Sequence, residues 1–146
     1  MRVLNQITQP TQTSCVCTCV AMLLGKTAQE VIDKWHHAYY FQQEFLGDIL
    51  QAEGVAYECH YAAHSPTLKP GGLYLLTVPS LNVDASFHQV IVDWRDEAKP
   101  VCFDPCKGRG DNLKYYTLDM DEWDDVNNAV RLVSWVLDFT ITRLPE

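Results

Sequence analysis

The sequence has no apolar run that approaches the roughly 20 residues needed to cross a lipid bilayer. Its first residues, Met1–Gln6, lack the apolar block and small-residue cleavage site of a signal peptide. Basic residues are also few, because 11 Lys and Arg stand against 19 Asp and Glu and give a formal net charge of −8. We therefore expect a cytoplasmic protein with no membrane partner, whose acidic character excludes a phosphate backbone, and so nucleic acid, as its ligand.

Metal-binding C-x-x-C pairs are absent too, although the chain has six cysteines. Cys15, Cys17 and Cys19 are two positions apart in a predicted helix, where alternate residues point to different sides. This spacing and the length of the chain disfavour a disulfide framework. We expect no metal and no cofactor, and most cysteines should be small buried hydrophobic residues. The alternative is a zinc site built from Cys102, Cys106 and a histidine.

No internal repeat or low-complexity linker divides the 146 residues, so one domain over residues 1–146 is expected. The apolar content of 47% and four tryptophans fit a globular protein with a substantial core. Apolar residues follow helical spacing over about 15–54 and alternate over about 55–144. A helical part followed by an antiparallel sheet predicts an α+β fold.

Capping signals and glycines bound the predicted helices, with Ser14 as the N-cap and Gly25 as the stop of the first. The helices cover about residues 15–24, 27–40 and 43–53. Strands are predicted where β-branched and aromatic residues gather. They cover about residues 55–61, 73–78, 87–94, 101–103 and 130–144, with a brief strand or turn at 115–121.

The most informative stretch runs from Gln9 to Gly25, because it changes character at Cys15. Before Cys15 it is polar and contains Pro10, and after it the chain is apolar and uncharged until Lys26. A cysteine in the first turn of a buried helix lies beside unpaired N–H groups and the positive end of the helix dipole. That environment favours the thiolate. We therefore predict that Cys15 is a catalytic nucleophile.

A cysteine nucleophile needs a base and a group that orients the base. His88 is the best candidate base because it begins an apolar strand, whereas the other histidines have polar or helical surroundings. Those histidines are His36, His37, His60 and His64. A hairpin centred on Asp96 places Asp104 opposite His88, with Cβ atoms about 5 Å apart. Asp104 then accepts a hydrogen bond from one ring nitrogen and leaves the other for a thiol. This register is an assumption, since no glycine fixes the turn type.

These residues also form a pattern that resembles a known family. Gln9, followed six residues later by Cys15 at the head of a buried helix, is similar to the papain-like cysteine peptidases. Within that superfamily, the run Cys15–Leu24 most resembles the bacteriocin-processing peptidases, which cleave double-glycine leader peptides, and their stand-alone relatives. The motifs Phe87–Asp93 and Phe103–Pro105 match the same branch in order and spacing.

The resemblance implies a papain-like fold and a role for each matching residue. It implies Cys15 as nucleophile, His88 as base and acid, and Asp104 as the orienting group. Gln9 would donate to the oxyanion together with a backbone N–H near Cys15. The implied activity is hydrolysis of an amide bond in a peptide or protein substrate, through an acyl-enzyme intermediate.

One position departs from the family pattern: Val16 stands where a glycine usually follows the nucleophile. A side chain there narrows the approach of a substrate to the backbone. This residue favours an alternative in which the cleft only binds a peptide, as an inactive or inhibitory module. A second alternative keeps the thiol chemistry but passes the acyl group to an amine or thiol, as an acyl transferase does.

Overall fold

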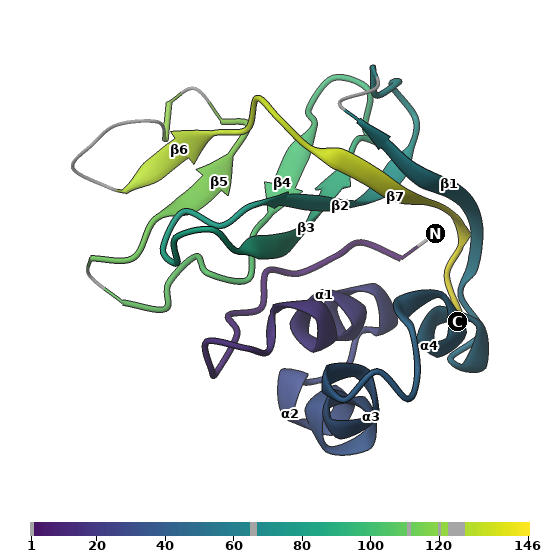
Figure 1. Ribbon diagram of the computed structural model, residues 1–146. Helices are drawn as coiled ribbons and strands as arrows, with labels where there is room; N and C mark the ends of the chain where they lie inside the picture. The colour runs from purple at the N-terminus through teal and green to yellow at the C-terminus, as the bar shows by residue number, and fades with distance from the viewer. Residues whose placement is uncertain (1, 65–66, 111, 120, 123–127) are drawn as a thin grey trace.

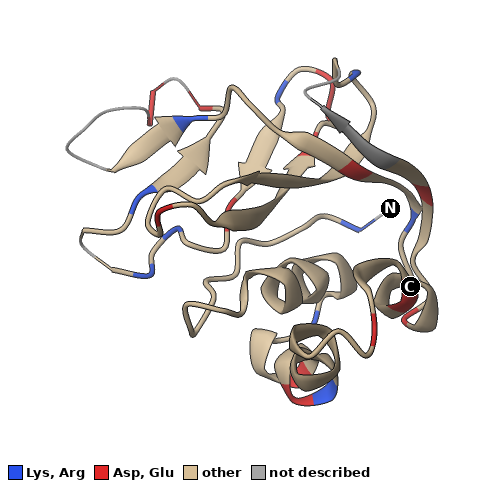
Figure 2. Ribbon diagram, in the orientation of Figure 1, with Lys and Arg blue, Asp and Glu red and all other residues tan. Residues whose placement is uncertain are grey.

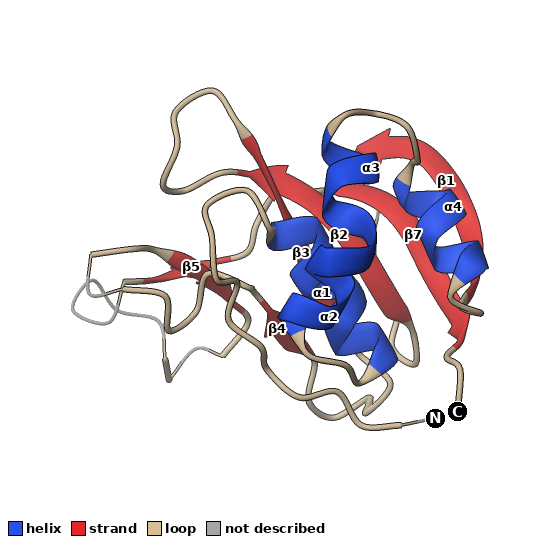
Figure 3. Cartoon of the chain, turned by 90° about the horizontal axis from the view of Figure 1, so that it is seen from below, coloured by secondary structure: helices blue, strands red, loops and turns tan. Residues whose placement is uncertain are grey.

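The computed structural model has its helices packed on one face of a five-stranded sheet, as two perpendicular views show (Figures 1 and 3). It describes residues 2–64, 67–110, 112–119, 121–122 and 128–146. The helical elements are α1 (Cys15–Leu24), α2 (Ala28–Val31), the π-helical turn η1 (Ile32–His36), α3 (His37–Tyr40) and α4 (Leu46–Ala52). The strands are β1 (Ala56–His64), β2 (Leu73–Pro79), β3 (Phe87–Asp93), β4 (Val101–Phe103), β5 (Tyr115–Thr117), β6 (Ala129–Arg131) and β7 (Val136–Arg143). The α+β class with an antiparallel sheet is confirmed.

Helix α1 is the centre of the core and has the predicted bounds. Eight of its ten residues are buried, and Gly25 ends it in the left-handed region with a φ of 68°. Ser14 is at the N-cap position, as predicted, but its hydroxyl does not cap the helix. Ser14 Oγ instead donates to the carbonyl of Thr11 at 3.0 Å, and no side chain caps the first turn. The N–H groups at the start of α1 are therefore left without a side-chain acceptor.

The next two predicted helices differ in how closely they match. Thr27 begins the second as predicted, because its hydroxyl accepts from the Glu30 amide at 3.2 Å, and the helix continues to Tyr40 through a π-helical turn. The third begins at Leu46 rather than near residue 43. Phe45 is still extended, and its amide donates to the Asp48 carboxylate at 3.2 Å, so the helix starts only after it.

The strand order of the main sheet is β1-β7-β2-β3-β4, and every neighbouring pair is antiparallel. The single strand predicted over residues 130–144 is two strands. The first, β6, leaves the main sheet and pairs with β5 in parallel, while β7 enters it between β1 and β2. This parallel two-stranded ribbon departs from the expected all-antiparallel arrangement, because one stretch of chain serves two sheets.

Packing of α1 on β3 decides which residues meet at its N-terminal end. Cys19 Sγ donates to the Gln89 carbonyl at 3.4 Å, which joins the middle of α1 to the start of β3. Cys15 lies one helical turn before Cys19 on the same face. His88 directly precedes Gln89, so the first residue of α1 and the second residue of β3 are brought together.

Within the residues that the structure describes, no single helix has both the length and the apolar character to cross a membrane. The segments Cys15–Leu24 and Ala28–Tyr40 pass such a test only when taken together, and they are bent by 113° relative to each other.

Candidate active site

All four residues predicted to form the site line one cavity of about 500 Å³. Gln9 and Cys15 reach it from the N-terminal segment and α1, and His88 and Asp104 from β3 and the end of β4. The cavity therefore lies between the helical layer and one end of the sheet, where segments far apart in the sequence meet.

Cys15 is the first residue of α1 and is partly exposed, whereas Cys17 and Cys19 are buried in the core. The first intrahelical hydrogen bond of α1 runs from the Thr18 amide to the Ser14 carbonyl at 3.0 Å. The amides of Cys15 and Val16 precede that bond, so neither has an acceptor within the helix. Burial and the neighbouring Cys15 raise the pKa of Cys17 to about 11 and that of Cys19 well above its usual range. These two thiols are thus poor nucleophiles, as predicted for packing residues.

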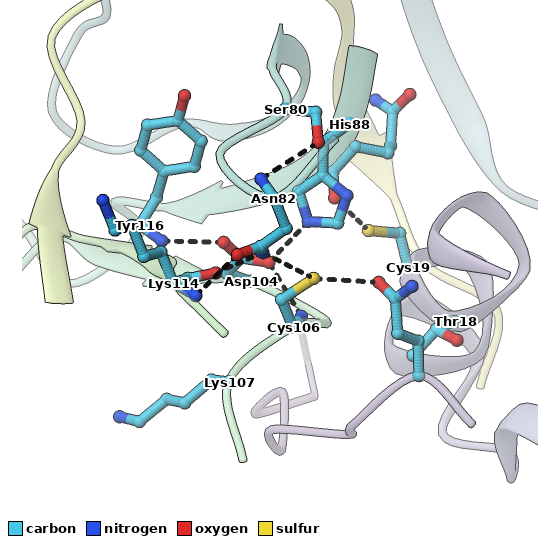
Figure 4. A network of polar contacts seen from close by, with 12 residues as sticks. Thr18, Cys19, Ser80, Asn82, His88, Asp104, Cys106, Lys107, Lys114 and Tyr116 are labelled. Atoms are coloured by element: carbon cyan, nitrogen blue, oxygen red, sulfur yellow. Dashed lines mark hydrogen bonds and ion pairs between the residues drawn. The ribbon is translucent and has the colours of Figure 1, made fainter. Parts of the chain in front are cut away.

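His88 and Asp104 form a close, largely buried pair (Figure 4). His88 Nε2 lies 2.6 Å from Asp104 Oδ1, and Asp104 is 1% exposed. The same carboxylate accepts two backbone amides, from Cys106 to Oδ1 at 2.8 Å and from Tyr116 to Oδ2 at 2.7 Å. Three hydrogen bonds therefore hold the carboxylate in a fixed orientation.

The protonation of His88 follows from these contacts. Burial alone lowers its pKa, but hydrogen bonds with Asp104, Cys106 and Cys15 and the negative charge of Asp104 raise the pKa to about 12. His88 is thus an imidazolium at neutral pH. Because Nε2 is engaged by Asp104, Nδ1 is the nitrogen left for a thiol.

The predicted register of the β3–β4 hairpin is wrong, although the contact derived from it exists. Val92 pairs with Cys102 rather than with residue 100, which places Asp104 in register with residue 90. The turn is centred later than assumed, because the Lys99 amide bonds to the Asp96 carbonyl at 3.1 Å. The error in pairing amounts to two residues and keeps every side chain on its face of the sheet. Asp104 therefore reaches His88 diagonally.

Gln9 is buried at the cavity wall, but its amide is engaged by the neighbouring loop. Nε2 donates to the carbonyls of Thr11 at 2.7 Å and Gln12 at 3.4 Å, and Oε1 accepts from the Cys106 thiol at 3.5 Å. Its backbone amide donates to the Pro105 carbonyl at 2.8 Å. These bonds make Gln9 an anchor of the loop before α1. Its role as oxyanion donor stays a prediction.

Cys106 is a site residue that we did not predict as such. Its thiol contacts Gln9, and a hydrogen bond with it contributes to the raised pKa of His88. Sequence reasoning considered it only as a core cysteine or as part of a zinc site. Its position two residues after Asp104, across Pro105, is the one signal that it shares the environment of the acid.

A metal could be held by donor atoms of His88, Asp104 and Cys106, which all lie within 4.8 Å of one another. This group has Asp104 where the zinc alternative had Cys102. However, the 2.6 Å between His88 and Asp104 is a hydrogen-bond length. Two ligands that each lie about 2 Å from one tetrahedral zinc are more than 3 Å apart. Zinc would thus have to displace the proton and separate the pair.

The other histidines whose side chains are described make different contacts. His36 and His37 stack near Tyr40 and Phe41 on the helices, and His60 bonds to Thr140 at 2.7 Å in the sheet. The side chain of His64 is outside the described residues. All six cysteines are free thiols, in agreement with the expectation that none forms a disulfide.

Two comparisons with known proteins did not identify a family for this chain. A scan against protein-family models found no match, and a search of curated proteins found none either.

Proposed function

We propose that this protein is a cysteine peptidase or a related thiol hydrolase with a papain-like fold, closest to the bacteriocin-processing branch. The observation that carries the proposal is the buried His88–Asp104 pair at 2.6 Å, which lines the same cavity as Cys15. Cys15 also contributes to the raised pKa of His88. A thiol, an imidazole and a carboxylate in this order are the components of a Cys-His-Asp triad. A cytoplasmic location is part of the same proposal.

In the first half of the reaction, the Cys15 thiolate attacks the carbonyl carbon of an amide. The oxyanion that forms is stabilised by the amides at the start of α1, each such donor being worth about 3 kcal/mol in comparable sites. His88, an imidazolium, then donates its proton to the leaving nitrogen, and the C–N bond breaks. An acyl thioester on Cys15 and a free amine result.

In the second half, His88 is neutral and accepts a proton from water as the water oxygen attacks the thioester carbonyl. The C–S bond breaks, the carboxylic acid leaves, and the thiolate–imidazolium pair is restored. Asp104 keeps its charge throughout and fixes the orientation of the ring, since its oxygens are held by His88 and by two backbone amides.

Aromatic residues at the rim of the cavity support a peptide as the substrate. Tyr40 and Phe87 both line the cavity, and they are 55% and 76% exposed. Large aromatic side chains exposed beside a cleft favour the binding of apolar groups. The two residues come from α3 and β3, so both the helical layer and the sheet supply such a surface.

Two alternatives keep the same cleft. An inactive peptide-binding or inhibitory module is favoured by Val16, which is nearly buried and lines the cavity directly after Cys15. An acyl transferase would use the same thioester and replace water by an amine or thiol.

Alkylation with iodoacetamide at mildly acid pH tests the proposal, with the adducts mapped by mass spectrometry. An ordinary thiol, with a pKa of about 8.5, is almost fully protonated under these conditions. We expect Cys15 to react first, and the exposed Cys59 provides the internal control. The preference should disappear in His88→Ala. Equal labelling of Cys15 and Cys59 in the unmodified protein would refute the ion pair and leave the binding module.

A further inference from the structure

The charges around the cavity are opposite to those of the whole protein. The chain has a net charge of −8, yet Arg109 and Lys114 line the cavity and Asp104 is its one acidic lining residue within the described part of the chain. Asp104 is buried and bonded to His88 and two amides. The charge that the cavity presents to a ligand is therefore positive.

Neither cation is paired with an acid among the residues that the structure describes. Lys107, on the same segment, contrasts with them because its Nζ lies 2.7 Å from Glu122 Oε1. The other ion pairs of Lys and Arg in the described residues, those of Lys26, Lys34 and Arg95, are also made away from the cavity. Arg109 and Lys114 thus remain available to a ligand.

Arg109 and Lys114 belong to the segment that joins β4 to β5, where Figure 2 shows basic residues close together. Hydrogen bonds fix the backbone of both residues. Asn82 clamps Lys114, since its Oδ1 accepts the Lys114 amide and its Nδ2 donates to the Lys114 carbonyl, both at 2.8 Å. The Arg109 amide donates to the Cys106 carbonyl at 3.1 Å. Figure 4 shows Lys114 and Asn82 beside His88, Asp104 and Cys106.

We infer that the substrate of this site is an acidic peptide segment, whose Asp or Glu side chains follow the scissile bond. This inference rests on the proposed function. His88 must protonate the leaving nitrogen, so the chain that continues from that nitrogen runs along the wall that holds His88. Arg109 and Lys114 line the cavity on the segment that begins with Asp104, the residue bonded to His88. Arg109 can take a carboxylate through two parallel hydrogen bonds, and Lys114 through a single charge.

The first experiment incubates the full chain with a pool of synthetic peptides of randomised sequence and reads the new termini by mass spectrometry. We expect Asp and Glu to be enriched in the first four positions after the cleaved bond. Arg109→Glu/Lys114→Glu should abolish the enrichment and lower kcat/KM on an acidic peptide by about tenfold or more, since each exposed pair accounts for a factor of up to about five. Salt at 0.5 M should weaken the preference of the unmodified protein.

Lys69→Glu/Lys99→Glu is the matched control. It makes the same change in net charge at two exposed lysines outside the cavity lining, and it should leave the preference intact. Cleavage without acidic enrichment, enrichment before the bond instead of after it, or an equal loss in the control variant would each overturn the inference. Thermal unfolding of each variant checks that it is folded.

A binding experiment separates this inference from the proposed function. Cys15→Ala cannot form a thioester, but it keeps both cations. In fluorescence anisotropy it should bind a labelled glutamate-rich peptide at least tenfold more tightly than a lysine-rich peptide of equal length. Acid-selective binding without any cleavage by the unmodified protein would refute the peptidase and keep the acidic ligand. Cleavage by the unmodified protein combined with no charge selectivity in binding would keep the peptidase and refute the acidic substrate.

Discussion

His88 Nε2 and Asp104 Oδ1 are 2.6 Å apart, although the two residues do not face each other in the β3–β4 ladder. The contact is possible because both side chains are on the same face and Asp104 follows directly after the end of β4. Backbone amides of Cys106 and Tyr116 then fix the carboxylate. The position of the acid is therefore set by main-chain donors as much as by the strand pairing.

Replacing Asp104 should cost stability in proportion to the bonds removed. We expect Asp104→Ala to lower the free energy of unfolding by about 3–5 kcal/mol, because it leaves a buried imidazolium and two amides unpaired. Asp104→Asn keeps the shape and one acceptor oxygen and should lose about 1–3 kcal/mol. Urea denaturation measures both. Asp48→Ala, which removes an acceptor at the start of α4, serves as control and should lose about 1 kcal/mol.

The raised pKa of His88 predicts how stability depends on pH. The folded protein holds the His88 proton up to about pH 12, whereas the unfolded chain releases it near pH 6.5. The stabilising contribution is thus complete below pH 6.5 and is lost as the pH rises through the interval between these values. In a Cys15→Ala background, where no thiolate forms on folding to offset the proton held by His88, the stability advantage over His88→Gln should shrink by about 1.4 kcal/mol per pH unit between pH 7 and 9. An advantage that stays constant over this interval would show that His88 is neutral.

A substitution of Gln9 tests whether this residue anchors the loop before α1 or donates to the oxyanion. We expect Gln9→Glu to lower the free energy of unfolding by about 1–3 kcal/mol, because the new oxygen faces the carbonyls of Thr11 and Gln12 without a proton to donate. The measurement is made in the Cys15→Ala background, where catalysis plays no part. Gln43→Glu, at an exposed position, should have little effect. Unchanged stability, together with a loss of 10²–10³ in kcat when Gln9→Glu is made in protein that keeps Cys15, would favour the oxyanion role.

Val16 should control access to Cys15. Val16→Gly is expected to raise the rate at which a peptidyl chloromethyl ketone alkylates Cys15 relative to the rate for iodoacetamide, since it removes a side chain that lines the cavity directly after Cys15. Val16→Ile, which adds a methylene, should slow the bulky reagent. If the ratio of the two alkylation rates is the same in both variants as in the unmodified protein, Val16 does not narrow the site.

Local signals predicted much of the fold. The bounds of α1 followed from one polar-to-apolar change and from Gly25. The strands predicted from composition at 73–78 and 87–94 agree with β2 and β3 to within one residue. The split between β6 and β7 was missed because it depends on pairing with β5 and β1, which lie far away in the sequence. No local pattern marks where a chain changes sheets.

The side chains of the candidate site could be predicted from the sequence, but the backbone amides and the strand register that position them could not. Cysteine, histidine and aspartate carry their chemistry in their type, so Cys15, His88 and Asp104 could be selected from the sequence. The amides that hold Asp104 come from Cys106 and Tyr116. Every residue except proline has a backbone N–H group, so the residue type does not reveal which amides will bind the carboxylate. The register depended on a turn without glycine, which nothing local fixed.

The segment that contains β5, β6 and β7 determines how short a fragment can be and still keep the candidate site intact. The motifs that resemble the peptidases finish at Pro105, and a fragment cut there would still contain Cys15, His88 and Asp104. It would lack the Tyr116 amide that grips the second carboxylate oxygen, and it would also lack β7, the strand that joins β1 to the rest of the main sheet. The segment after Pro105 contains none of the four candidate site residues, yet it supplies both backbone amides that hold the Asp104 carboxylate and the strand that joins β1 to β2.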